Sequence, residues 1–366
     1  MKKLLIASAV SAAFAAPTVA LAQAARAPTL SQVLDASGIN VSGYLDAGYS
    51  YANRNVEPGG FSNRVFDAQN NSFSLHQFGL QVAKQPSRGF GGVVNITVGS
   101  DAQVIHAFPE TTAGAGSMFD ITQAYGQYST GGLTLMAGKF VTLAGSEVIW
   151  SPSNSNFSRS ILFGAIPFTH TGVRAGYAVS DIVTLYGGMN NGWDQLTDQN
   201  RQKTLELGVT LNPMKPLSIT VSGYFGNEVV GAANGERDLI DVVANWVVNN
   251  SLNLGAEFLT KKQDIPGGTT QKADGFALYF NYTLNSQWRA SVRGEYFNDK
   301  QGGQFGTANG TKYDEATLTL AYLPNSSVEL RTEVRGDKAN NAVYVDSDGS
   351  TKKSLLTFGL QGLYKF

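Results

Sequence analysis

Most of this 366-residue chain consists of segments in which apolar and polar side chains alternate. In 276–284 and 328–334, for example, every second side chain is apolar or β-branched. Successive side chains of a β-strand point to opposite faces, so each segment predicts a strand with one apolar face. From residue 40 onward we count about 16 such segments of roughly 10 to 13 residues, longer than the usual strand of about 5 to 6. The pattern predicts an all-β protein with unusually long strands.

Strand length and number decide between a soluble sheet and a membrane protein. A soluble β-sandwich also has strands with one apolar and one polar face, so a single strand does not separate the two classes. A strand that crosses a bilayer needs about 9 to 11 residues, which these segments supply. Every backbone polar group in a membrane must pair within the protein, so the sheet must close. We therefore predict a transmembrane antiparallel up-and-down β-barrel of about 16 strands.

The connections between the segments alternate in length, as expected for short periplasmic turns and longer outer loops. The short connections carry Gly, Pro, Asn, Ser or Asp and lie at 86–88, 130–132, 180–181, 212–215, 249–250, 285–286 and 324–325. The long connections lie at 52–71, 103–118, 142–169, 193–201, 228–236, 263–271, 300–311 and 338–351.

The third long connection, 142–169, is too apolar for a solvated surface loop. Its large apolar residues are Val148, Ile149, Trp150, Phe157, Ile161, Leu162, Phe163, Ile166 and Phe168. Such residues need a surface to bury against, and a barrel of this size otherwise encloses an aqueous channel. We expect the loop to fold into the barrel and narrow the pore. A cap over the outer mouth and a contact between subunits are the alternatives.

The first 39 residues differ from the rest of the chain. Residues 1–22 have a positive start at Lys2 and Lys3, an apolar centre and small residues at the end, which predicts a cleaved signal peptide. We expect 23–39 to be a short periplasmic segment with a helix capped by Thr29 and ended by Gly38, and 40–366 to be the barrel.

Composition excludes several functions. The chain has no cysteine and nearly equal numbers of basic and acidic residues, 27 and 28, so neither thiol chemistry nor nucleic-acid binding is expected. His76, His106 and His170 do not show a metal-ligand spacing, so we expect no metal, no cofactor and no enzymatic activity.

Two stretches carry a family resemblance. SNFSRSILFGAIPFTHTGVRAGY, residues 155–177, and LSQVLDASGINVSGYLDAGYSY, residues 30–51, resemble the β-barrel porin-2 family of OmpL-like outer-membrane proteins. The final strand, SLLTFGLQGLYKF, resembles the last strand of bacterial outer-membrane proteins. That resemblance implies that Tyr364 and Phe366 signal to the barrel-assembly machinery. It also implies a location in the bacterial outer membrane, in contact with lipid and lipopolysaccharide.

A porin lets small hydrophilic solutes diffuse passively, and the width and charges of its pore set selectivity. We predict a constriction at Glu147, Arg159 and Arg174. The other charged residues expected to line the lumen are Asp241, Glu257, Arg289, Arg293, Glu295, Glu329, Arg331, Glu333 and Arg335. Pairing of these charges with one another is the alternative. A structural or adhesive barrel with an occluded lumen remains a second function, and an outer-membrane lipid enzyme a weaker third. Association of three barrels is left open.

Overall fold

The structure is a computed structural model that describes residues 29–54, 63–109, 117–230 and 233–366. The chain divides into two compact units, 1–38 and 39–366. The predicted signal peptide lies outside the described residues. In the first unit, α2 (Leu30–Ser37) begins after Thr29, whose side chain accepts a hydrogen bond from the Gln32 amide, and ends at Gly38 in the left-handed region. The predicted helix is confirmed. None of the described helices is long and apolar enough to cross a membrane.

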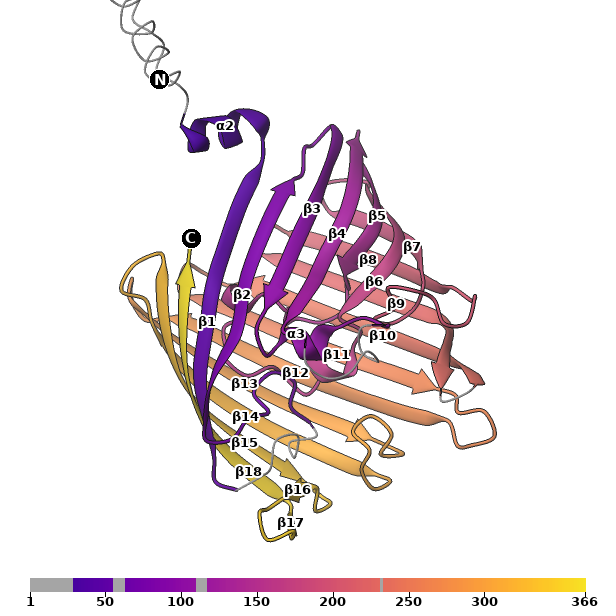
Figure 1. The fold of residues 1–366 in the computed structure, drawn as a ribbon, viewed down its shortest axis with the longest axis vertical. Helices are drawn as coiled ribbons and strands as arrows, with labels where there is room; N and C mark the ends of the chain where they lie inside the picture. Colours follow the sequence, from indigo (N-terminus) through magenta and orange to yellow (C-terminus); the bar gives the residue numbers. More distant parts are fainter. Residues whose placement is uncertain (1–28, 55–62, 110–116, 231–232) are drawn as a thin grey trace, which may run out of the picture. The chain divides into compact units, whose positions relative to one another are not determined.

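The second unit is a closed antiparallel barrel formed by sixteen of the described strands, shown in Figure 1. They are β1 (Asn40–Ala52), β2 (Ser72–Lys84), β3 (Gly89–Val98), β4 (Phe119–Thr130), β5 (Leu133–Val141), β6 (Thr169–Ala178), β7 (Val183–Asn190), β8 (Thr204–Met214), β9 (Leu217–Val230), β10 (Ala233–Val247), β11 (Leu252–Gln263), β12 (Gln271–Thr283), β13 (Trp288–Asp299), β14 (Thr311–Tyr322), β15 (Val328–Ala339) and β18 (Ser354–Lys365). The predicted fold and strand number are confirmed.

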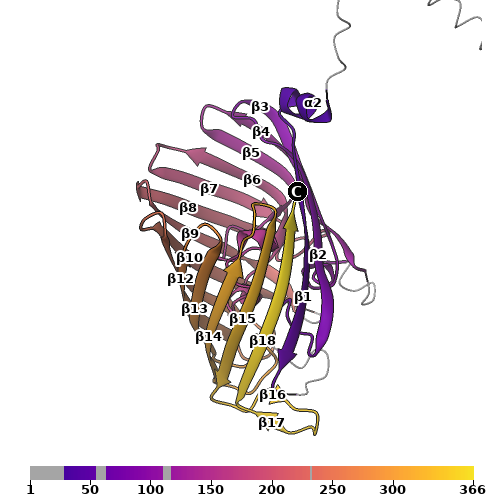
Figure 2. The same cartoon turned by 90° about the vertical axis from the view of Figure 1, so that its left-hand side faces the viewer.

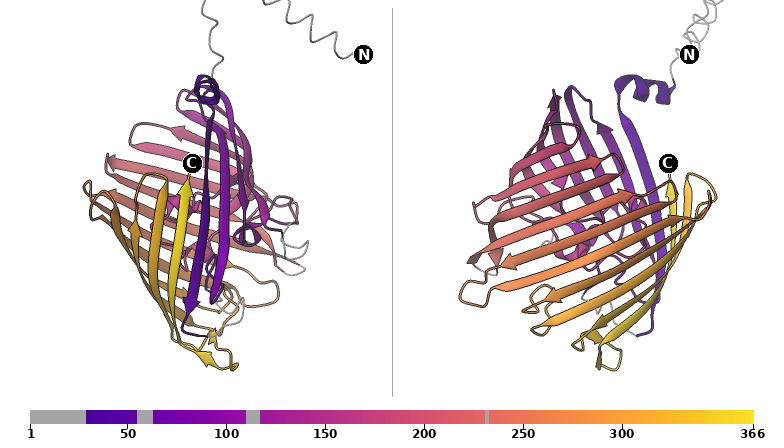
Figure 3. Two further views of the ribbon diagram at one scale, coloured as in Figure 1. Left: turned by 60° about the vertical axis from the view of Figure 1, so that its left-hand side comes forward. Right: turned by 180° about the vertical axis from the view of Figure 1, so that it is seen from behind.

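The barrel closes where its first and last strands pair. Tyr44 of β1 lies opposite Lys365 of β18, and the register continues to Ala52 opposite Thr357. Figure 2 shows β15, β18 and β1 side by side at this closure, and the views in Figure 3 follow the wall around to the opposite strands. Closure leaves no free sheet edge, which is the condition for burying strands in lipid.

The two faces of β18 show how the sequence pattern becomes an inside and an outside. Phe358 and Leu360 are each 40% exposed on the outer face, whereas Leu355 and Gln361 on the inner face are 1% and 4% exposed. An aqueous barrel interior would leave its side chains wet, so the buried inner face needs something inside the barrel to cover it.

One predicted loop is wrong. Residues 228–236 were expected to form one of the long outer loops between alternating segments. Instead β9 continues to Val230 and β10 begins at Ala233, with Asn227 paired opposite Glu236. Backbone pairing extends this hairpin almost to its tip, because turn residues are needed only at the tip itself. In the last long loop, β16 (Tyr344–Val345) and β17 (Thr351–Lys352) form a small separate hairpin.

Candidate functional site

The connection between β5 and β6, residues 142–168, lies inside the barrel and is called the inner loop below. Its backbone amides at Gly145 and Ser146 donate hydrogen bonds to Asp241 on β10 (2.8 Å) and Glu257 on β11 (3.0 Å). The amide of Ser151 donates to the hydroxyl of Tyr44 on β1 (3.3 Å). Contacts with strands this far apart in the barrel order place the loop across the lumen. The prediction that it enters the barrel is confirmed.

Wall carboxylates hold the inner loop by its main chain. The two oxygens of Glu333 on β15 accept hydrogen bonds from the amides of Phe157 (2.7 Å) and Ser158 (2.9 Å). Glu295 on β13 accepts from the amide of Ile161 (2.8 Å). Hydrogen bonds to an ionised acceptor are about twice as strong as neutral ones. They bind backbone groups, so they fix the path of the loop rather than a particular loop side chain.

Wall guanidinium groups do the same for the loop carbonyls. Arg331 on β15 donates to the carbonyl of Asn156 (3.1 Å), and Arg293 on β13 donates to that of Ser158 (2.8 Å). These arginines are at most 1% exposed, so nearly all of each guanidinium faces protein. Five N–H donors in a rigid fork allow one arginine to bind loop and wall at once.

The same charges also pair with one another. Arg293 lies 2.7 Å from Glu147 of the inner loop and 3.2 Å from Glu315 on β14. Arg331 lies 2.7 Å from Glu329, which also accepts from Arg289 (2.5 Å). The alternative that much of the row from Glu329 to Arg335 pairs with itself or with Arg289, Arg293 and Glu295 is confirmed. Removing one partner of such a buried pair leaves a buried charge uncompensated, which costs about 3–5 kcal/mol.

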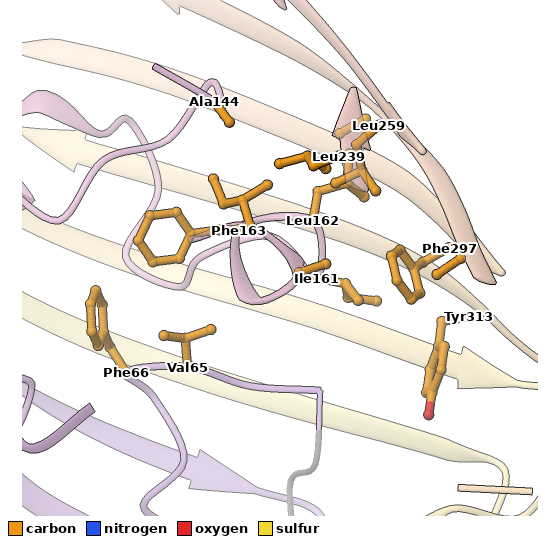
Figure 4. Close-up of a cluster of buried hydrophobic side chains, with 14 of the residues drawn as sticks. Val65, Phe66, Ala144, Ile161, Leu162, Phe163, Leu239, Leu259, Phe297 and Tyr313 are labelled. Atoms are coloured by element: carbon orange, nitrogen blue, oxygen red, sulfur yellow. The ribbon is translucent and has the colours of Figure 1, made fainter. Parts of the chain in front are cut away.

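Apolar packing fastens a second part of the inner loop, shown in Figure 4. Ile161 and Leu162 are fully buried, and Phe163 is 3% exposed. They belong to one cluster with side chains of the wall, among them Leu239 and Phe297. Burying an aliphatic or aromatic side chain contributes about 1.5–3 kcal/mol. The apolar composition that made this segment unusual as a loop is therefore explained by its position inside the barrel.

A third fastening point depends on glycine. The ring of Phe157 lies against Gly48 on β1 and Gly359 on β18. A Cβ atom at Gly359 would stand 2.6 Å from Phe157 Cδ1, and one at Gly48 would stand 3.1 Å from Phe157 Cζ. Neither wall position has room for a side chain without movement of the ring. The ring of Phe157 can therefore pack against the wall because both positions are glycine.

The other side of the inner loop faces a cavity of about 610 Å³. None of the described residues that line it carries a charged side chain. They are Ser42, Gln81, Asn95, Thr122, Gln123, Val141, Thr142, Leu143, Ala144, Gly145, Val148, Ile149, Trp150, Ser153, Phe163, Pro167, Phe168, Tyr186, Thr210 and Thr220. The wall residues come mainly from β2–β9 and are mostly uncharged polar, whereas the loop residues are mostly apolar.

A second cavity, of about 360 Å³, lies on the inner loop's side toward β10–β13. Seven asparagines contribute to its lining, and Glu147 and Arg289 are its charged members. Ser153 lines both cavities, so this part of the inner loop separates them.

Residues 38–366 match the protein family described as "Putative beta-barrel porin-2, OmpL-like". The chain belongs to this family of porins. No curated protein matches the sequence. The family and the fold are those of a channel of the outer membrane.

Solved porins share the barrel at low sequence identity. OmpT of Vibrio cholerae, in vitro folded and in trimer form, has a TM-score of 0.62 at 12% identity, covering 90% of this chain and 99% of that one. The outer membrane channel DcaP of Acinetobacter baumannii has 0.62 at 14% identity, with 90% and 97% covered. An anion-selective porin from Comamonas acidovorans has 0.62 at 11%, with 90% and 99% covered. At these identities the likeness shows the fold.

The structure places the three predicted constriction residues in two separate parts of the porin. Glu147 and Arg159 both lie in the inner loop, where Arg159 is 1% exposed and donates to the carbonyl oxygen of Val148 (3.0 Å). Arg174 lies on β6, bonded to Glu206 on β8 (2.7 Å). Its guanidinium also covers a phenyl ring of the same wall, at Phe140. The assignment of these residues to a constriction stays a prediction.

The remaining predicted charges lie where the inner loop meets the wall of the porin. Arg335, for instance, donates to the carbonyl of Arg159 (2.5 Å) and lies 2.8 Å from Asp337. Asp241 and Glu257 each accept from one loop amide, and each keeps a second oxygen without a partner in the described structure. Their role in selectivity stays a prediction.

Sequence reasoning did not identify two of the buried polar residues inside the barrel, Glu315 and His76. Glu315 follows the inward alternation of Tyr313 and Thr317 on β14, so that alternation was a sufficient signal. No such signal marked His76, which is the extra residue of a β-bulge on β2. Its Nδ1 lies 3.0 Å from Asp101 in the connection between β3 and β4. A bulge interrupts the two-residue period on which the sequence argument depended. Among the described residues no group of His, Asp or Glu could hold a metal ion.

Proposed function

We propose that small hydrophilic solutes cross this porin by passive diffusion between the inner loop and the wall formed by β2–β9. The observation that carries the proposal is the division of charge inside the barrel. The 610 Å³ cavity on this side has no charged side chain in its lining, whereas the charges of β10–β15 are used to hold the loop. The space left by the loop on this side is therefore uncharged, with a polar wall and an apolar loop surface.

This arrangement supports weak ion selectivity. Selectivity depends on pore width and on the charges that line the path. Arg293, Arg331 and Arg335 are at most 1% exposed and each has a carboxylate partner, so little of their field reaches the cavity. In this proposal Glu147, Arg159 and Arg174 shape the constriction by fixing the loop and its wall, and do not present free charge to a solute.

A reversal-potential measurement in planar bilayers across a KCl gradient tests the proposal. We expect a reversal potential close to zero for the native chain. Gln123→Glu adds a carboxylate to the cavity and keeps the acceptor for the Val141 amide, so it should shift the channel toward cations. Gln287→Glu, in an exposed short turn between β12 and β13, is the matched control and should have no comparable effect. Strong native selectivity, or no response to Gln123→Glu, would contradict this path.

An occluded structural or adhesive barrel is the second candidate. It is favoured by the extent of the loop's contacts, which run from β1 to β10, β11, β13 and β15. The same bilayer experiment separates the two, because an occluded barrel gives no conductance. We do not propose a lipid enzyme, because His170 is fully buried and stacked on Tyr224 at 4.5 Å.

We further propose the partners of an outer-membrane porin. Tyr364 and Phe366 are 50% and 55% exposed on the outer face of the last strand, as a signal to the assembly machinery requires. The surrounding outer face contacts lipid and lipopolysaccharide. Residues 1–22 act as a cleaved signal peptide and 23–39 remain on the periplasmic side. Association of three barrels is supported by the similar OmpT of Vibrio cholerae in trimer form.

A further inference from the structure

The cavity between the inner loop and the β2–β9 wall has two chemically different sides. We infer that it is a binding site for an uncharged polyhydroxylated ring, a solute of the pyranose class, which occupies it in transit. The inference rests on the proposed function and adds the solute class to it. It depends on the apolar loop side, on the hydrogen-bonding wall side and on the absence of charge between them.

The loop side presents apolar surface to the interior of the barrel. Val148 is 41% exposed, although it lies on a segment held inside the lumen, and Leu143, Trp150 and Phe168 beside it are each partly exposed. Apolar surface in contact with water is unfavourable by about 25 cal/mol per Å², so a solute that covers it is favoured. The two faces of a pyranose ring carry C–H groups, which fit against such a surface.

The wall side presents amides and hydroxyls. Asn95 on β3 is 2% exposed, and its Nδ2 donor has no hydrogen-bond partner among the described residues. Leaving a buried donor unpaired costs about 1–3 kcal/mol, so a hydroxyl of a bound solute would relieve a real deficit. Thr122, Thr210 and Thr220 add hydroxyls along the same wall; Thr122 already bonds to Thr97 (2.7 Å) and Thr210 to Thr220 (2.9 Å), which leaves each hydroxyl a free acceptor site. The hydroxyl groups around a pyranose ring would accept a hydrogen bond from Asn95 and exchange hydrogen bonds with the three threonines.

Size and charge narrow the class of solute. A volume of about 610 Å³ lies within the roughly 300–1,000 Å³ typical of small-molecule sites. A charged solute would lose hydration without meeting an opposite charge, which is unfavourable. A linear polyol has hydroxyls along its whole length and no continuous apolar face. It can form hydrogen bonds with the wall, but it cannot cover the apolar side chains of the loop. An uncharged pyranose ring can do both, because its C–H faces cover the loop while its hydroxyls bond to the wall.

Saturable block of the channel tests the inference. We would record current through the reconstituted full chain while adding methyl β-glucoside or, in parallel, sorbitol. The glucoside should reduce the current with a half-saturating concentration well below that of sorbitol. An open channel that responds equally to both, or to neither, overturns the inference while the proposed function stands. A channel that never conducts overturns the proposed function first.

Two loop variants and one control locate the site. Trp150→Ala should raise the half-saturating glucoside concentration about three- to tenfold, the usual worth of one aromatic contact. Val148→Ser should act in the same direction with a smaller shift, and it avoids the packing of Trp150 on Tyr44 at 4.5 Å. Trp246→Ala, at an exposed apolar position on β10 outside the cavity lining, is the control and should leave block unchanged. Unchanged block in both loop variants, or equal weakening in the control, would place any sugar binding elsewhere.

Discussion

Two arcs of the barrel wall differ in how they use polar residues. The anchoring arc, β10–β15 with β18, carries buried carboxylates and guanidinium groups that bind the inner loop, as Glu333 and Arg293 do. The open arc, β2–β9, lines the large cavity with uncharged side chains such as Asn95 and Thr122. Charged pairs exist in the open arc too, but Arg174 and Glu206 neutralise each other outside the cavity lining.

The comparison shows that a charged lumen residue is not necessarily a selectivity residue. Two charges that pair in a buried place exert little field in the pathway, and their net contribution to stability is small. What they supply is position, because the charged groups bind particular loop amides or carbonyls, as Glu333 binds the amides of Phe157 and Ser158. The open arc makes fewer bonds to the loop, through Tyr224 on β9 and Gln77 on β2, and the rest of its lining faces the cavity.

The largest effect is expected from Arg293→Met in the anchoring arc. The substitution leaves Glu147 and Glu315 buried without their shared cation, which should cost about 3–5 kcal/mol. We expect a lower urea midpoint of unfolding in detergent, followed by tryptophan fluorescence, and noisier single-channel current as the loop loosens. Arg289→Met is the control: its side chain is 23% exposed, and Glu329 keeps Arg331 (2.7 Å) and Lys365 (3.6 Å) as partners, so we expect a smaller loss of stability. Equal losses of stability in the two variants would show that the contacts of Arg293 with the inner loop do not set its effect.

A smaller effect is expected where Phe157 rests on the anchoring arc. Gly359→Ala places a methyl group 2.6 Å from the ring, and overpacking of this kind costs about 1–3 kcal/mol. The loop should shift toward the open arc and reduce conductance. Gly336→Ala on the adjacent β15, where an added Cβ meets nothing within 4 Å, should leave conductance unchanged. Wild-type conductance in Gly359→Ala would show that Phe157 does not set the loop's position.

The smallest expected effect is a pH dependence of the free energy of unfolding, caused by a carboxyl group at the end of the inner loop. Asp194, in the connection 191–203, accepts from the amides of Phe168 (2.9 Å) and Thr169 (2.8 Å). Burial raises the pKa of Asp194 from 3.8 to about 6. The folded state therefore binds the proton more tightly than the unfolded state, and this contribution to the free energy of unfolding is lost as pH rises from about 4 through 6.

Asp194→Asn keeps an acceptor oxygen and has no carboxyl proton to lose. The variant should be as stable as the native chain near pH 4 and more stable above pH 6. Thermal unfolding across this range is the measurement. A parallel decline in both proteins would show that Asp194 does not couple the loop to pH.

Much of the barrel was predictable from local sequence. The two-residue period along 276–284 and 328–334 assigned both faces, because a strand's side chains alternate whatever its partners are. The hairpin at 228–236 was not predictable, because Gly and Asn favour turns but do not fix where pairing stops. The charged rows of β13 and β15 were also visible, together with the option that they pair.

The sequence by itself determined a closed, lipid-embedded sheet with an apolar third loop. Periodicity and composition are local properties, and a bilayer allows few structures that satisfy them. Only the tertiary structure decided that most of the loop's main-chain bonds go to β10–β15, and that a cavity remains on the side of β2–β9. Backbone amides and carbonyls are the same in every residue, so a sequence does not record which of them a distant Glu295 or Arg331 will bind. The uncharged cavity is what remains after those bonds are made.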